Sequence, residues 1–127
     1  MPSPKKRKQE KDRVKIGRSY EELAAHFFLD SGYQILSRNY RAGQKEIDLI
    51  VQKGNTLVFV EVKSASSAKF GHPAERVDKK KIANLIQAAQ QYLIENNVEG
   101  CDLRFDVVTF VKGEMEHYPA AFEIENN

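Results

Sequence analysis

The chain has 127 residues, of which 30% are charged and 41% are hydrophobic, and its formal net charge is +2. This length suits one domain with a real hydrophobic core, and no apolar run approaches the roughly 20 residues that a membrane helix needs. The single cysteine, Cys101, excludes an internal disulfide framework, so we expect a cytoplasmic protein with no membrane partner.

Residues 1–16 form a basic arm with few apolar side chains. They hold seven Lys and Arg against two acidic residues, a net charge of +5, whereas the rest of the chain carries −3. We expect the arm to be disordered. It could bind nucleic acid, serve only as a solubilising tail, or act through its Pro-Lys-Lys-Arg-Lys run as a nuclear import signal. One domain is predicted at residues 17–122 and a short tail at 123–127.

A first helix is predicted from about Ser19 to Gly32, because Ser19 and Glu22 have the spacing of a capping box. The expected apolar stripe consists of Tyr20, Leu23, Ala24 and Phe27. Glu21 lies at the margin of that stripe. A solvated glutamate is the commoner interpretation of such a position, but Glu21 can also point across the edge of the core.

Strands are predicted at residues 33–40, in a hairpin over 46–64, at 103–111 and, as a short edge strand, at 115–118. A long polar connection follows the hairpin over residues 64–77, and a second helix begins after Asp78, a good N-cap residue. The core order αβββαβ predicts an α/β fold with a mixed central sheet flanked by helices.

The hairpin carries charged residues inside apolar strands. Its two aliphatic faces are formed by Ile47, Leu49 and Val51 and by Val58, Val60 and Val62. If these faces meet, a loop over residues 53–56 places Asp48 directly across from Glu61 on the other face. Two facing carboxylates destabilise neighbouring strands, and a divalent cation would compensate them best.

An ordinary solvated outer face is the alternative interpretation of these charges. Ile50, Leu57 and Phe59 share the face, however, so its end near the turn is expected to be covered and only its far end to open into a cleft. Carboxylate oxygens there suit Mg²⁺. Lys63, two residues after Glu61 on the same face, could orient an attacking water or hold transition-state charge.

The second helix begins with Lys79, Lys80 and Lys81. Cations in a first turn oppose the helix macrodipole, at a cost of about 0.3–1 kcal/mol each. A bound phosphate would compensate that cost, and full solvation of three flexible lysines is the alternative.

Asp48 followed by Glu61-Val62-Lys63 resembles the PD-(D/E)XK nuclease signature, with Ile47 where that signature has Pro. From Gly17 to Phe122 the chain is also similar to the YraN-type family of uncharacterised bacterial endonuclease-like proteins. The segments that carry this second resemblance include Gly17-Arg18, Gly32-Tyr33, Asn39-Tyr40-Arg41, Glu46 to Ile50, Leu57 to Lys63 and Arg104 to Val108.

The resemblance implies a restriction-endonuclease-like core related to Holliday-junction resolvases, a Mg²⁺ or Mn²⁺ cofactor, and hydrolysis of phosphodiester bonds in DNA, including branched or recombining DNA. It implies that Asp48 and Glu61 bind the metal, with the Val62 carbonyl as a further ligand. Lys63 would be the catalytic lysine and Glu21 the added helix carboxylate. The residues expected to hold nucleic-acid phosphates are Arg18, Lys69, Arg76, Lys79 and Lys81.

Three positions depart from the family's pattern. Tyr20 and Lys45 stand where Gly is usual, and Ser64-Ala65 follow Lys63 in place of Thr-Arg, which removes an expected phosphate contact. The alternative is therefore a non-catalytic nucleic-acid or protein-binding module that kept the nuclease fold. An RNA substrate also stays open, as does a homodimer by analogy with resolvases.

Overall fold

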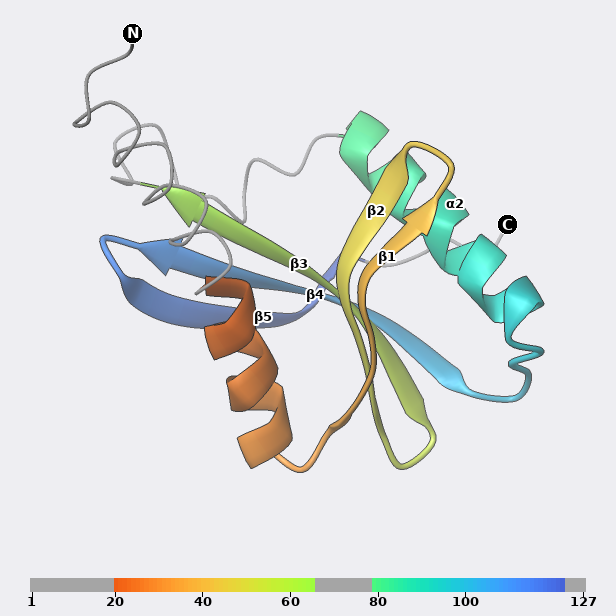
Figure 1. Ribbon diagram of the computed structural model, residues 1–127, viewed down its shortest axis with the longest axis horizontal. Coiled ribbons are helices and arrows are strands. Elements are labelled where there is room, and N and C mark those ends of the chain that lie inside the picture. Colours follow the sequence, from red (N-terminus) through yellow and green to blue (C-terminus); the bar gives the residue numbers. More distant parts are fainter. Residues whose placement is uncertain (1–19, 66–78, 123–127) are drawn as a thin grey trace, which may run out of the picture.

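The computed structural model describes residues 20–65 and 79–122, which form two helices and one five-stranded mixed sheet in the order αβββαββ. This confirms the predicted α/β class. The elements are an N-terminal helix over residues 20–30, β1 (Gln34–Ala42), β2 (Lys45–Lys53), β3 (Thr56–Ala65), α2 (Lys79–Glu95), β4 (Asp102–Val111) and β5 (Glu114–Phe122) (Figure 1).

The sheet has the strand order β1-β2-β3-β4-β5. Only β3 and β4 run parallel, and the other three neighbouring pairs are antiparallel. A parallel pair needs a crossover connection, and α2 lies within the connection between β3 and β4. Lys53 pairs with Thr56 across the β2–β3 turn, which is the predicted hairpin register.

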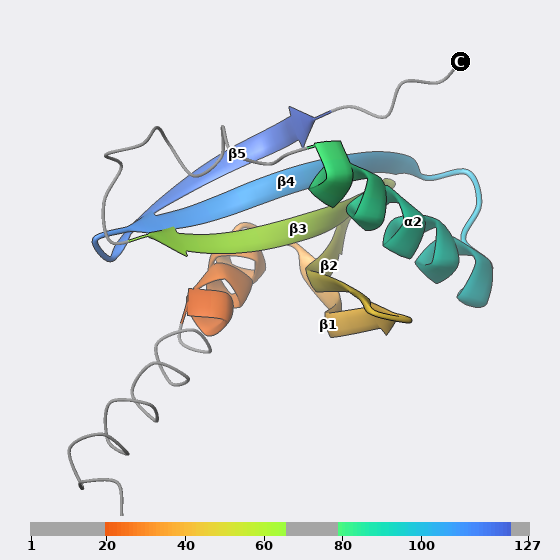
Figure 2. The ribbon, with the colours of Figure 1, turned by 90° about the horizontal axis from the view of Figure 1, so that it is seen from above.

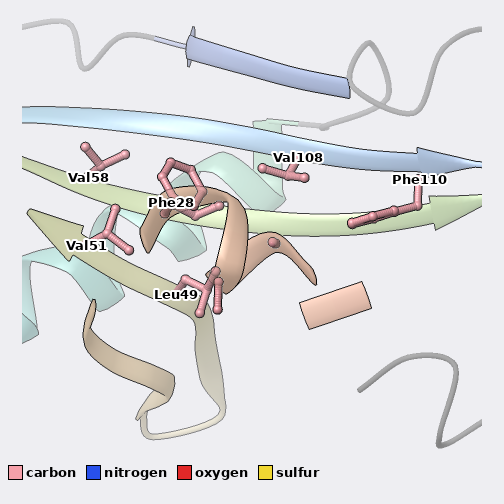
Figure 3. Packing of buried hydrophobic residues seen from close by; sticks show 9 residues of the cluster. Phe28, Leu49, Val51, Val58, Val108 and Phe110 are labelled. Carbon is pink, nitrogen blue, oxygen red and sulfur yellow. The ribbon is translucent and has the colours of Figure 1, made fainter. Parts of the chain in front are cut away.

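The N-terminal helix packs on one face of the sheet and forms the first core. Ala24, Ala25 and Phe28 of this helix are completely buried against side chains of β2, β3 and β4, and Figure 3 shows Phe28 among them. The sheet residues of this core are Leu49, Val51, Val58, Val60, Val108 and Phe110. Burying each large side chain stabilises the fold by about 1.5–3 kcal/mol.

Helix α2 packs on the opposite face and forms the second core (Figures 1 and 2). Ile50, Leu57 and Phe59 belong to it, so the turn end of the polar hairpin face is covered, as predicted. Ile47 also belongs to this core, whereas Leu49 and Val51 belong to the first. The expectation that Ile47 shares a face with Leu49 and Val51 is therefore wrong, and the alternation of faces breaks at Asp48.

The buried stripe of the N-terminal helix also differs from the prediction. Leu23, which was expected inside, is 52% exposed, while Ala25 and Phe28 are fully buried. Since Glu21 is four residues before Ala25, this rotation turns Glu21 toward the sheet. The helix ends at Asp30, and the predicted stop residue Gly32 follows it. The φ of Gly32, 90°, allows the Tyr33 N–H to donate to Phe28 O in a Schellman motif.

A polar network on β4 and β5 closes the first core at one end. Asp106, only 1% exposed, accepts hydrogen bonds from Arg104 Nε at 2.8 Å and from the Ala120 N–H at 3.0 Å, and its Oδ2 lies 2.7 Å from His117 Nε2. Arg104 also donates to the Tyr33 hydroxyl. The Arg104–Asp106 segment quoted for the family resemblance thus has a structural explanation.

Several predictions fall on residues that the structure does not describe. They are the basic arm at 1–16, the helix cap Ser19, the connection at 66–77, the cap Asp78, the tail at 123–127, and the phosphate-binding candidates Arg18, Lys69 and Arg76. Neither helix in the described ranges combines the length and apolarity needed to cross a membrane.

Candidate active site at the strand fork

The predicted acidic pair lies where β2 leaves β3. Pairing between these strands ends at Leu49 and Val60, whereas β3 continues beside β4 as far as Ala65 and Val111. The two strands diverge beyond that point, and Figure 1 shows β1 and β2 bending away from β3. We call this point, formed by Asp48, Leu49, Val60 and Glu61, the strand fork.

Asp48 closes the strand fork with its side chain. Its Oδ2 accepts a hydrogen bond from the Val62 N–H at 2.8 Å, in the place of a sheet hydrogen bond from β2. Asp48 and Glu61 therefore lie at the predicted register positions but are not a paired rung of the ladder. The side-chain oxygen replaces a backbone partner, which explains how β2 can turn away without leaving the Val62 N–H unsatisfied.

Three other carboxylates influence Asp48 electrostatically. Burial, together with the nearby negative charges of Glu61, Glu21 and Glu46, raises the pKa of Asp48 from its ordinary value of 3.8 to about 7, although the Val62 hydrogen bond opposes this rise. Several carboxylates thus compete for the same small region. A bound cation would relieve their repulsion and favour the ionised form of Asp48.

Glu61 lies on β3 with its side chain only 9% exposed. Its Oε1 lies 3.2 Å from the Nζ atom of Lys81, which reaches over from the first turn of α2. Lys81 was predicted to hold a nucleic-acid phosphate, and the structure places its ammonium group against the candidate metal ligand itself. Lys79 is exposed at the start of the same helix.

Glu21 approaches Asp48 from the N-terminal helix, on the other side of the strand fork. The two residues line one pocket of about 290 Å³ together with Glu22, Arg38, Asn39 and Leu49. The structure therefore favours the inward interpretation of Glu21 over the solvated one.

Asn39 links two of the carboxylates around this pocket. With its amide nitrogen turned toward them, Asn39 donates to Glu21 Oε2 at 3.2 Å and to Glu46 Oε1 at 3.0 Å. Its φ of 54° is left-handed, a conformation that Asn adopts more readily than most residues. No sequence pattern had indicated a role for Asn39 or Glu46, although both stand in segments that carry the family resemblance.

Val62 and Lys63 complete the predicted site. In a strand, the N–H and C=O groups of one residue point toward the same neighbouring strand. The Val62 carbonyl therefore faces the strand fork, as the Val62 N–H does. Lys63 is half-buried, two residues after Glu61, and shares its face of β3. Thr109 pairs with Lys63 in the sheet register and is fully buried, and its hydroxyl has no hydrogen-bond partner in the described part of the chain.

Within residues 20–65 and 79–122, no group of three or more His, Cys, Asp or Glu side chains is placed so that it could hold a metal ion. The donor set predicted here is smaller than such a group, so it stays a prediction. Mg²⁺ is usually held by one or two carboxylates, and water and substrate phosphates complete its coordination. Asp48, Glu61 and the Val62 carbonyl are a donor set of that kind.

Comparison with known proteins identifies the family. The family model described as "Uncharacterised protein family UPF0102" matches residues 20–110. The chain belongs to the UPF0102 family. The match runs from the N-terminal helix to most of β4 and includes all the described residues of the strand fork and the pocket.

The chain is also similar to individual UPF0102 proteins. One from Chloroherpeton thalassium is 48% identical over 103 residues, which cover 81% of this chain and 80% of that protein. Another from Persephonella marina is 38% identical over 109 residues, covering 86% and 94%. A third from Chlorobium chlorochromatii is 50% identical over 93 residues, covering 73% and 71%.

Proposed function

We propose that this UPF0102 protein is a metal-dependent endonuclease that hydrolyses phosphodiester bonds in DNA. The observation that carries the proposal is the strand fork. There, Asp48 and Glu61 interact electrostatically at the point where two strands separate, and Lys63 follows Glu61 on the same face. Glu21 adds a carboxylate from the N-terminal helix. These are the four catalytic positions predicted from the sequence.

The donor set fits a hard divalent cation. Asp48 and Glu61 would hold Mg²⁺ or Mn²⁺ through carboxylate oxygens, and the Val62 carbonyl supplies a third oxygen on the same side of β3. When bound, such an ion polarises a phosphoryl oxygen and lowers the pKa of a coordinated water. The excess of carboxylates around Asp48 supports a cation rather than a neutral ligand at this position.

The remaining residues act on substrate and solvent. The Lys63 ammonium can hold the attacking water in line or stabilise the negative charge that develops on the phosphorus oxygens. Glu21 and Asn39 line the pocket beside Asp48. The carboxylate of Glu21 can accept a hydrogen bond from a water molecule there. DNA phosphates would be held by Lys79 and, outside the described residues, by Arg18, Lys69 and Arg76.

A non-catalytic nucleic-acid or protein-binding module is the second candidate. The ion pair between Lys81 and Glu61 favours it, because a candidate metal ligand already has a cationic partner. The Ser64-Ala65 pair, which replaces the family's Thr-Arg, points the same way. This candidate predicts binding of DNA without turnover and no effect of divalent metal on thermal stability.

A cleavage assay separates the two candidates. Linear, flapped and four-way-junction DNA are incubated with the full-length protein in Mg²⁺, in Mn²⁺ and in EDTA, beside Asp48→Ala and Lys63→Ala. We expect metal-dependent cleavage by the wild type. Losing the lysine is expected to lower the rate on the order of 10²–10³-fold, and losing Asp48 to lower it at least as much.

Glu22→Gln is the control variant, because Glu22 lies at the pocket rim and no catalytic role is proposed for it. It should cleave at close to the wild-type rate. Equal cleavage by the wild type, Asp48→Ala and Lys63→Ala would remove the strand fork as the active site. Binding without cleavage on every substrate would favour the second candidate.

A further inference from the structure

The contact between Lys81 and Glu61 joins α2 to the sheet at the strand fork. Lys81 is on α2 and Glu61 is on β3, and their charged atoms lie 3.2 Å apart. The Glu61 side chain is 9% exposed, whereas that of Lys81 is 45% exposed. The lysine thus reaches from solvent to a nearly buried carboxylate, and it can leave that carboxylate without crossing the core.

The position of Lys81 is costly for α2 by itself. The first turn of α2 contains no acidic residue, and a cation there opposes the helix dipole. The strand fork supplies what the helix lacks, because Glu61 offers Lys81 a negative partner. In return Lys81 neutralises one of the carboxylates that surround Asp48.

We infer that Lys81 is a built-in counter-cation of the strand fork, which holds Glu61 while no metal is bound and competes with the divalent cation for it. Metal binding then requires Glu61 to exchange the Lys81 ammonium for the ion. Lys81 is a positioning residue in this account. It holds the Glu61 carboxylate in the metal-free site and lowers the affinity for metal. The inference rests on the proposed function insofar as Glu61 is a metal ligand.

If Lys81 competes with the metal for Glu61, its removal should raise the affinity for metal. Removing a positive charge next to a metal site should tighten metal binding, because the ion no longer displaces a favourable partner from Glu61. For a pair that is exposed at one end, we expect Lys81→Gln to bind Mn²⁺ about three- to tenfold more tightly than the wild type. Lys81→Arg keeps the cation and should bind Mn²⁺ like the wild type.

The experiment is isothermal titration of Mn²⁺ into the full-length protein, without nucleic acid. The wild type is compared with Lys81→Gln, Lys81→Arg, Glu61→Gln and the control Lys80→Gln, which removes an exposed lysine from the same turn. Thermal unfolding of each variant in EDTA and in Mn²⁺ gives a second readout. The melting-temperature gain on adding Mn²⁺ should be larger for Lys81→Gln than for Lys80→Gln.

If the role of Lys81 were purely structural, Lys81→Gln would lower the melting temperature in EDTA and leave the affinity for Mn²⁺ unchanged. That outcome, or weaker Mn²⁺ binding by Lys81→Gln, overturns the inference. If Glu61→Gln alone abolishes Mn²⁺ binding, the proposed metal site survives without the competing lysine. If no variant and no wild-type protein binds Mn²⁺, the inference and the metal site both fail.

Discussion

Asp48 does two things at the strand fork that no other described residue does. Its carboxylate satisfies the Val62 N–H, which the diverging β2 backbone does not reach, and it sits among the charges of Glu61, Glu21 and Glu46. The first interaction fixes the side chain in place. Burial, together with the second interaction, raises the pKa of Asp48 to about 7, so near neutral pH this carboxyl is divided between its two protonation states.

The raised pKa of Asp48 predicts how stability depends on pH in the absence of metal. The native state binds the Asp48 proton more tightly than the unfolded chain, whose carboxyl has the ordinary value of 3.8. The stabilising effect of this proton is therefore complete below about pH 4 and is lost as the pH rises through 7. In EDTA, the melting temperature of the wild type should fall more between pH 5 and pH 8 than that of Asp48→Asn.

Thermal unfolding followed by circular dichroism at several pH values makes this comparison. Asp102→Asn serves as the control, because it removes an exposed carboxylate from the start of β4 and should keep the wild-type profile. If the melting temperatures of the wild type and Asp48→Asn depended on pH in the same way, the pKa of Asp48 would not be raised in the folded protein.

Lys81 shows why part of the site was hidden from the sequence. The composition of its helix turn indicated an anion partner, and bound phosphate was the natural candidate. The actual partner, Glu61, precedes it by twenty residues and lies on another element. Only the packing of α2 across β3 brings the two together, so no local spacing rule could have predicted the pair.

Among the elements, the N-terminal helix determines whether Glu21 faces the pocket. Phe28 anchors this helix in the first core and is completely buried, while the neighbouring Leu29 is 45% exposed. We expect Phe28→Ala to lower the free energy of unfolding by about 3–5 kcal/mol, and Leu29→Ala to lower it by about 0.5 kcal/mol.

Urea denaturation of both variants tests how the helix is seated. A larger loss for Leu29→Ala than for Phe28→Ala would mean that the helix packs on the sheet through the face that carries Leu29 and not through Phe28. The stripe expected from the sequence contained Ala24, but it also contained the exposed Leu23 and left out the buried residues Ala25 and Phe28. The true buried face is offset toward Glu21.

Asp106 of β4 is buried, and it links β4 to β5 through His117 and the Ala120 N–H. Burial would raise the pKa of Asp106, but the hydrogen bonds from His117, Arg104 and the Ala120 N–H hold it below its ordinary value. Asp106→Asn keeps the shape and loses the charge. It should lower the free energy of unfolding by about 1.5–3 kcal/mol, measured by urea denaturation at pH 7.

Asp102→Asn on the same strand is again the comparison, with an expected change within about 0.5 kcal/mol. Because the pKa of Asp106 is lowered, its contribution is present at neutral pH and is lost as the pH falls. If Asp106→Asn had the free energy of unfolding of the wild type, the charge of Asp106 would contribute nothing to the stability of the β4–β5 pair.

The strand fork marks the limit of sequence prediction at the level of elements. The hairpin register followed from matching two aliphatic faces, and the observed pairs from Leu49–Val60 to Lys53–Thr56 confirm it. The divergence beyond Leu49 depends on how β1 and β2 twist together away from β3. The alternation rule assumes a regular strand, so it put Ile47 on the wrong face and Asp48 in a paired rung.

For the whole molecule, the α/β class and the element order followed from hydrophobic periodicity, and the family match shows membership of UPF0102. The last strand was underestimated: β5 continues to Phe122, which stacks on Phe105 of β4. Pro119 within β5 interrupts a strand pattern, and it is tolerated because β5 lies at the edge of the sheet.

The central claim is that Asp48 and Glu61 together hold one divalent cation at the strand fork. Crystals of the wild-type protein soaked in Mn²⁺ test it directly through the anomalous scattering of the metal. We expect one strong peak at the strand fork, about 2.0–2.2 Å from carboxylate oxygens of both residues, and no such peak in Asp48→Ala. A wild-type fork without manganese at saturating Mn²⁺, or a peak unchanged in Asp48→Ala, would contradict it.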